Sequence, residues 1–180
     1  MTKLVKVALS ALLGIIVLAI GSSCSTSPES LPWEESYGQF YTRDLARAQE
    51  EIPFPIVLPS YVPDERTDAP PPSITGPLRE YQDDDRVKVE VLYFVDLGNE
   101  ILGIIEIEEN NYPVLPGDPE LNPDLERIEV CGWEVIKVEG DFQQGPGIIY
   151  FFSQDNIYFV VGIYDFPPGE AQKVIESMLE

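Results

Sequence analysis

The chain contains no histidine. Histidine is the usual general base of enzymes and the commonest metal ligand, so its absence argues against the most frequent catalytic and metal-binding arrangements. Basic residues are also scarce: 11 Lys and Arg stand against 32 Asp and Glu, for a formal net charge of −21. A chain this acidic lacks the clustered positive charge that nucleic-acid phosphates require. We therefore expect no nucleic-acid partner.

Cysteine is nearly as rare, because the chain has Cys24 and Cys131 alone. Cys131 follows a strand-like run and has no basic neighbour that would favour a reactive thiolate, so we expect a small buried side chain. The nucleophile motif G-x-S-x-G, the P-loop and C-x-x-C are all missing. The sequence therefore predicts no catalytic residue, no cofactor and no enzymatic activity.

Acidic residues are abundant, but they lack the spacing of a calcium-binding loop. Asp83-Asp84-Asp85 and the alternating Asp118, Glu120, Asn122 and Asp124 are interpreted as solvated turns. Glu106, Glu108 and Glu109 are expected on the wet face of a strand. The sequence therefore predicts no metal site.

Long apolar runs are missing except at the N-terminus. Lys3 and Lys6 precede Val7–Ile20, which carries no charge, and small residues follow. This order is typical of a secretory signal, here residues 1–23, and the run is shorter than the roughly 20 apolar residues of a spanning helix. An uncleaved signal anchor is the alternative.

Gly21-Ser22-Ser23-Cys24 resembles the bacterial lipobox, in which a cysteine after small residues is lipidated and becomes the new N-terminus. The resemblance implies a lipid anchor at Cys24, on the extracytoplasmic face of the cell membrane. An ordinary signal cut near Ser23, with an incidental cysteine, is the alternative. Residues 24–36 are rich in Ser, Pro and Glu and predict a flexible tether, and residues 37–180 predict a single domain.

The rest of the chain alternates between short apolar patterns and turns. Helices are predicted over Thr42–Glu51, which Thr42 would cap, and over Gly169–Leu179. Ile52–Pro63 has four prolines and predicts an edge strand or a wrapped arm, whereas Asp64–Pro77 predicts an exposed loop. Strands are predicted over Val87–Val95, Ile101–Glu108, Arg127–Val130, Trp133–Glu139, Gly147–Phe152 and Ile157–Tyr164.

These elements predict an α+β fold. The connections are too short for βαβ crossovers, so we expect a curved antiparallel sheet of about six strands, with an N-terminal and a C-terminal helix packed on it. The core is expected to include Ile149, Phe151, Phe159, Val161, Val174 and Met178.

Aromatic residues crowd the last predicted hairpin. Tyr150, Phe152, Tyr158 and Tyr164 would form an apolar binding face if one side of the sheet were open. The alternative is that helices cover one face and that the other is half-covered.

Ile52-Pro53-Phe54-Pro55, followed by Leu58-Pro59-Ser60-Tyr61-Val62-Pro63, resembles a bacterial domain family of unknown function. That family is found in extracytoplasmic lipoproteins and in proteins related to anti-sigma factors and sporulation. The likeness extends from about Ala48 to Leu179, and the family is distantly similar to lipoprotein-carrier half-barrels. The resemblance implies no catalytic residues, and we expect a non-enzymatic, membrane-anchored domain that binds a partner protein or envelope component. The alternative is a carrier or sensor of an apolar ligand, held in the concavity of the sheet.

Overall fold

A computed structural model of the chain describes residues 33–64, 68–82, 86–98, 102–114, 116–117 and 124–180. The predicted signal sequence, Cys24 and most of the predicted tether lie outside the described residues. So do Asp83-Asp84-Asp85 and Asp118, Glu120 and Asn122.

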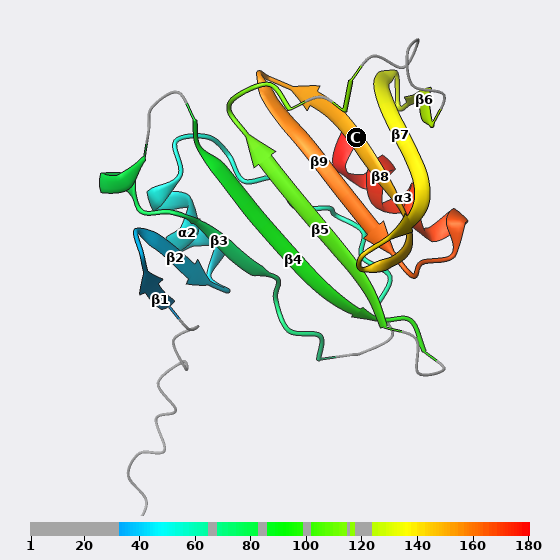
Figure 1. Cartoon of the computed structure of the whole chain (residues 1–180). Coiled ribbons are helices and arrows are strands. Elements are labelled where there is room, and N and C mark those ends of the chain that lie inside the picture. Colours follow the sequence, from blue (N-terminus) through cyan, green and yellow to red (C-terminus); the bar gives the residue numbers. More distant parts are fainter. Residues whose placement is uncertain (1–32, 65–67, 83–85, 99–101, 115, 118–123) are drawn as a thin grey trace, which may run out of the picture. The chain divides into compact units, whose positions relative to one another are not determined.

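The described residues form one antiparallel sheet of nine strands, whose order is β1-β2-β3-β4-β5-β9-β8-β7-β6 (Figure 1). The strands are β1 (Trp33–Ser36), β2 (Gln39–Thr42), β3 (Ser73–Pro77), β4 (Lys88–Asp96), β5 (Leu102–Asn110), β6 (Leu125–Val130), β7 (Trp133–Phe142), β8 (Gly145–Gln154) and β9 (Ile157–Tyr164). The α+β class and the antiparallel sheet are confirmed, but the sheet is larger than the six strands that we expected.

The centre of the sheet follows the alternation in the sequence. Val89 and Val91 are fully buried on one face of β4, and Ile107 of β5 pairs with Val91. β5 then pairs with β9, the last strand, so the β4–β5 and β8–β9 hairpins join in the middle of the sheet. Asp155 and Asn156 form the β8–β9 turn with φ of 52° and 65°, the left-handed values that a two-residue hairpin turn requires.

Two α-helices, α2 (Leu45–Glu51) and α3 (Pro168–Leu179), lie on the same face of the sheet, behind it in Figure 1. We call this side the helix face. The predicted stripe of α3 is confirmed, because Ala171, Val174, Ile175 and Met178 are at most 6% exposed. A 3₁₀ turn, η1 (Arg79–Tyr81), follows β3.

The N-terminal part differs most from the expectation. Trp33–Ser36, the end of the predicted tether, is strand β1, and Ser73–Pro77, the end of the predicted loop, is strand β3. Helix α2 begins at Leu45 rather than Thr42, because Asp44 is the N-cap and its Oδ1 accepts a hydrogen bond from Arg47 N at 3.2 Å.

Candidate functional site

The predicted aromatic face does not exist as one surface. Tyr150 and Phe152 are on the helix face, where they are 3% and 6% exposed, and Phe152 stacks on Phe159 with ring centroids 4.8 Å apart. Tyr158 and Tyr164 are on the other face, because Tyr158 pairs with Ser153 and Tyr164 with Gly147. The prediction of one binding face from these four residues is wrong. The sequence of this hairpin is apolar at nearly every position, so it does not show on which face of the sheet each side chain lies.

The predicted core needs the same correction. Phe159, Val161, Val174 and Met178 are buried as expected. Ile149 and Phe151, by contrast, are only half-buried on the face opposite the helices, where Phe151 pairs with Val160. The physical reason is that side chains alternate along a strand, so a parity error moves a whole set to the other face.

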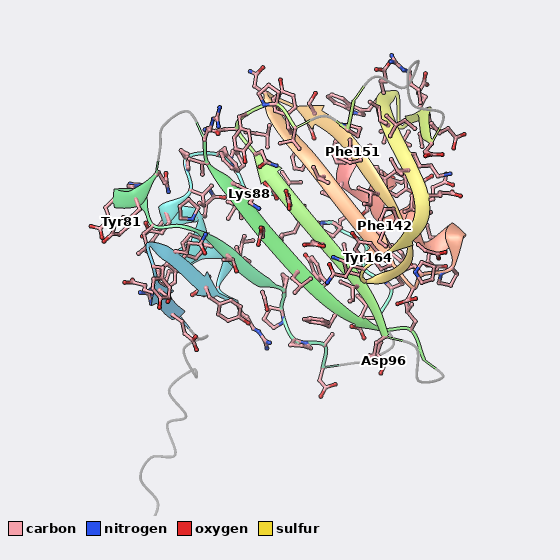
Figure 2. All side chains as sticks on the ribbon, viewed as in Figure 1. Tyr81, Lys88, Asp96, Phe142, Phe151 and Tyr164 are labelled. Atoms are coloured by element: carbon pink, nitrogen blue, oxygen red, sulfur yellow. The ribbon has the colours of Figure 1, made fainter. Side chains whose placement is uncertain are left out.

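The face of β4, β5, β9, β8 and β7 that is turned away from both helices is called the outer face here. It carries Tyr164, whose ring lies over two glycines. A Cβ on Gly162 would meet the Tyr164 hydroxyl at 2.4 Å, and one on Gly147 would meet Cδ1 at 2.6 Å. Phe142 packs edge-on against this ring at 5.8 Å, so Tyr164 is 4% exposed and does not offer a binding surface (Figure 2).

Charged side chains lie on the outer face of β4 and β5. Lys88 Nζ is 2.5 Å from Glu90 Oε1 and 3.6 Å from Glu108 Oε1. Glu106 lies on the same face of β5, and burial, together with the like charges of Glu108 and Glu90, raises the pKa of its carboxyl. The cluster is thus explained as an ion-paired surface in which Lys88 partly compensates three glutamates.

A hollow lies at the end of the sheet where β9 leads into α3. This end groove has a volume of about 1090 Å³. It is lined by Leu97, Leu102, Glu139, Gly140, Asp141, Pro146, Gly147, Ile148, Ile163, Asp165, Phe166, Pro167 and Ala171. Its volume is slightly above the roughly 300–1,000 Å³ typical of ligand sites, and most of the lining residues are apolar.

Local backbone features shape the end groove. Gly103 lets Phe166 approach β5, because a Cβ there would meet Phe166 Cε2 at 2.2 Å. Asp165 has a φ of 61°, and its amide donates to Pro146 O at 2.9 Å. Gly145 leaves room for the Asp165 carboxylate, which a Cβ would meet at 2.8 Å. The groove is therefore built into the turn between β9 and α3.

The charge of the end groove has one sign. Its lining includes the carboxylates of Glu139, Asp141 and Asp165 and no Lys or Arg. Glu139 is paired with Lys137, whose Nζ is 2.5 Å from Glu139 Oε1. The groove thus combines an apolar floor with acidic groups, and it favours a ligand with apolar and cationic parts.

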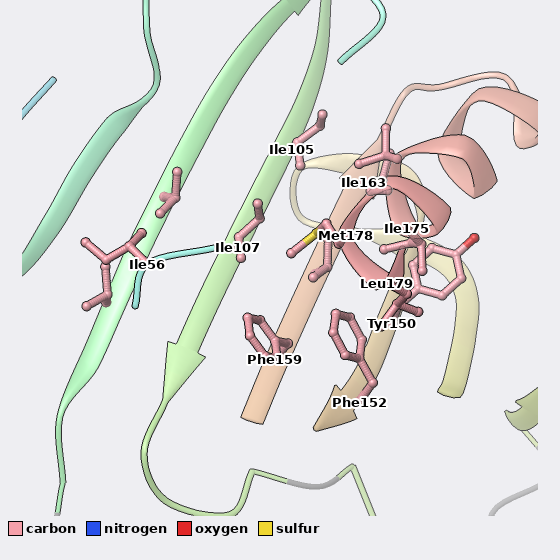
Figure 3. Close-up of a cluster of buried hydrophobic side chains, with 14 of the residues drawn as sticks. Ile56, Ile105, Ile107, Tyr150, Phe152, Phe159, Ile163, Ile175, Met178 and Leu179 are labelled. Atoms are coloured by element: carbon pink, nitrogen blue, oxygen red, sulfur yellow. The ribbon is translucent and has the colours of Figure 1, made fainter. Parts of the chain in front are cut away.

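The space between the sheet and α3 is filled by side chains. Val174 and Ile175 of α3 are fully buried, as are Val161 and Val135 of the sheet, and Phe159 is 1% exposed. Figure 3 shows aromatic and aliphatic side chains of both layers in one cluster. This packing leaves the end groove as the better candidate for a binding site.

Glu109 is buried, contrary to the expectation that it lies on a wet face. The alternation of Ile105, Ile107 and Glu109 places all three on the helix face, and each is 0% exposed. Glu109 Oε1 accepts a hydrogen bond from Val57 N at 2.9 Å, whereas Oε2 has no partner among the described residues. Burial raises the pKa of Glu109 to about 8. Sequence reasoning missed this residue although its parity indicated it.

Cys131 is exposed, so the expectation of a buried thiol is wrong. It lies with Gly132 in the two-residue turn between β6 and β7, where its φ is 50°. A turn residue at a sheet edge has no neighbouring layer to cover it.

Within the described ranges, no three His, Cys, Asp or Glu side chains are grouped so that they would hold a metal ion. No helix in the same part of the chain has the length and apolar character needed to cross a membrane. Comparisons with protein-family models, with curated proteins and with solved structures find no match to the chain.

Proposed function

We propose that the protein is a lipid-anchored, non-enzymatic domain on the extracytoplasmic face of the cell membrane that binds another protein. The anchor is Cys24, which follows an apolar run and small residues as in bacterial lipoproteins. The partner docks in the end groove.

The observation that carries the binding proposal is the chemistry of the end groove. Leu102 is 63% exposed at its rim, and Ile163 and Ala171 are buried in its wall. Large exposed apolar side chains beside a hollow are typical of interaction sites. The nearby carboxylates Asp141 and Asp165 favour a protein segment that brings Lys or Arg.

The alternative function, carriage of an apolar ligand in the concavity of the sheet, has less support. It needs an empty space between the sheet and the helices, yet Phe152, Phe159 and the stripe of α3 fill that space. An apolar ligand would have to displace a packed core, which costs several kcal/mol for each large side chain that is uncovered.

The anchor is tested by replacing Cys24 with serine. The full chain should partition into the detergent phase, and Cys24→Ser should move it to the aqueous phase, because two or more acyl chains are needed for firm attachment. If Cys24→Ser stays in the membrane with residues 1–23 uncleaved, an uncleaved signal anchor holds the protein instead.

The binding site is tested by Leu102→Asp in the full chain. This change places a carboxylate at the rim of an already acidic groove, and the side chain is exposed enough for the fold to tolerate it. We expect the partner that co-purifies with the wild-type chain from native membranes to be lost. Phe94→Asp is the matched control, because Phe94 is 54% exposed on β4 but does not line the groove. Retention of the partner by Leu102→Asp, or equal loss from both variants, would contradict this placement.

A further inference from the structure

Residues 52–63 form an arm that crosses the helix face without joining a strand. Its four prolines have no N–H to give to a sheet ladder. Phe54 and Ile56 are 7% and 8% exposed, and Figure 3 shows Ile56 in the same apolar cluster as Ile107 and Phe159. The arm therefore covers apolar side chains of the central strands, and its attachment depends on contacts made by side chains.

The hydrogen bonds of the arm involve side chains of three other elements. At its start, Gln49 of α2 accepts from Ile56 N at 2.9 Å and donates to Phe54 O at 2.7 Å. In the middle, Val57 N donates to Glu109 Oε1 of β5 at 2.9 Å. Towards its end, Tyr61 N donates to Ser177 Oγ of α3 at 3.1 Å. Among the described residues, no backbone–backbone hydrogen bond joins residues 53–63 to the sheet.

Among the side chains that bond to the backbone of the arm, Glu109 is ionisable, and it is fully buried. Its register partners, Val89 of β4 and Phe159 of β9, are apolar and buried. The hydrogen bond from Val57 N serves one carboxyl oxygen and leaves Oε2 without a partner in the described part of the chain. A neutral carboxyl is tolerated there, but a carboxylate would be a buried charge with no hydrogen bond to one of its two oxygens.

Four other ionisable groups near the arm have shifted pKa values, and each shift moves the pKa away from the range of Glu109. On β4, burial and the Glu109 charge raise the pKa of Tyr93 further above neutrality. On the α3 side, Tyr61 donates a hydrogen bond to Glu170, which also pairs with Lys173 at 2.8 Å. These contacts lower the pKa of Glu170 and raise the pKa values of Tyr61 and Lys173. Residues 52–60 carry no ionisable side chain.

We propose that residues 52–63 are a strap that the neutral Glu109 carboxyl latches to the sheet, and that ionisation of Glu109 opens it. An ionised Glu109 needs water at Oε2, and the strap is the element over it that is not fixed by a β-ladder. Opening uncovers apolar side chains such as Ile107, so the protein has a closed form in acid and an increasingly open form as pH rises. This inference does not depend on the end groove.

The direction follows from the two pKa values of Glu109. The pKa is about 8 with the strap closed, and access of water to the carboxyl would lower it toward the ordinary 4.5. Below 4.5 both forms are protonated and the latch is complete. Between pH 4.5 and about pH 8, Glu109 is ionised in the open form and neutral in the closed form. The equilibrium constant for opening therefore rises about tenfold per pH unit. Above 8 it is constant again.

Hydrogen exchange of the strap amides in the full chain tests the proposal. The probe is the protection factor of the Ile56, Val57 and Tyr61 amides, which divides out the intrinsic dependence of exchange on pH. We expect wild-type protection to fall about tenfold per pH unit from pH 5 to 8. In Glu109→Gln, which keeps an oxygen for Val57 N, protection should stay at the acid level throughout.

Two comparisons make the outcome decisive. Glu106→Gln removes a carboxyl of raised pKa from the other face of β5, and it should leave the steep fall unchanged. The strap amides should also be less protected than the β5 amides at every pH. The proposal would be overturned if the protection of the strap amides fell as steeply with pH in Glu109→Gln as in the wild type. Strap protection equal to that of β5 would also overturn it, because the strap would then open only when the whole domain unfolds.

Discussion

Gly147 and Gly162 illustrate how single residues determine the outer face. Both leave space for the ring of Tyr164, and Phe142 closes over the same ring. Their absent side chains explain why a tyrosine at a strand end is almost fully buried on a face that neither helix covers. A buried aromatic side chain that packs against glycines in this way contributes to stability rather than to binding.

Gly162→Ala should destabilise the domain by about 1–3 kcal/mol, because the new methyl group overlaps the Tyr164 ring. Gly140→Ala is the matched control on β7, where a Cβ meets Phe142 at an ordinary 3.7 Å. Denaturant melts of both variants measure the difference. Equal midpoints for the two variants would show that the Tyr164 ring does not lie over Gly162.

Glu109 makes global stability depend on pH in the direction opposite to an ordinary paired carboxylate. Its pKa rises from the usual 4.5 to about 8 on folding, so its contribution is complete below 4.5 and is lost as pH rises to 8. The shift corresponds to about 5 kcal/mol over this range. Glu109→Gln should therefore be much more stable than wild type at pH 8 and nearly equal at pH 4.5. Urea melts at both values check this, and a constant difference between the proteins would count against a neutral Glu109.

At the scale of elements, β8 and β9 determine which aromatic side chains stabilise the fold. Phe152 stacks on Phe159 in the helix-face core, whereas Phe151 is half-buried on the outer face. Phe152→Ala should cost about 3–5 kcal/mol, and Phe151→Ala clearly less. Thermal melts of the two neighbouring variants test the register of the hairpin, and a larger loss for Phe151→Ala would mean that the register is shifted by one residue.

The elements that could be predicted are those with a long, regular pattern. The strand around Val91 and the stripe of α3 have the period of their structure, and both are present. β1, β2 and β3 have four or five residues each, and β3 includes Gly76 and Pro77, so they resemble loops in sequence. These strands form because β3 pairs with the edge of β4 and β2 and β1 follow. This is a tertiary contact, and local sequence preferences do not show it.

The face of the sheet on which a side chain lies was harder to predict than the presence of the strand. Gly147–Phe152 is apolar at nearly every position, so the run contains no alternation that would separate Phe151 from Phe152. The opposite holds for Glu109, whose alternation with Ile105 and Ile107 indicated the buried face, although its charge led to the other assignment. The end groove could not be predicted, because its lining extends from Leu97 to Ala171 and is assembled by the fold.

At the scale of the whole molecule, charge and attachment act together. The chain has a net charge of −21, which would repel the domain from anionic head groups, while the proposed lipid at Cys24 would hold it near the membrane. Such a domain is presented to partners rather than pressed on the lipid. In the proposed function, the end groove is the surface with which it binds.

The central claim is that the anchored domain binds another protein through the end groove, and photo-crosslinking in cells that produce the full chain tests it most directly. A photoreactive amino acid replaces Leu102 in one variant and Phe94 in the other, so that both report from exposed positions on adjacent strands. We predict a discrete protein adduct in the membrane fraction from position 102 and none from position 94. No adduct from position 102, or the same adducts from both positions, would contradict the account.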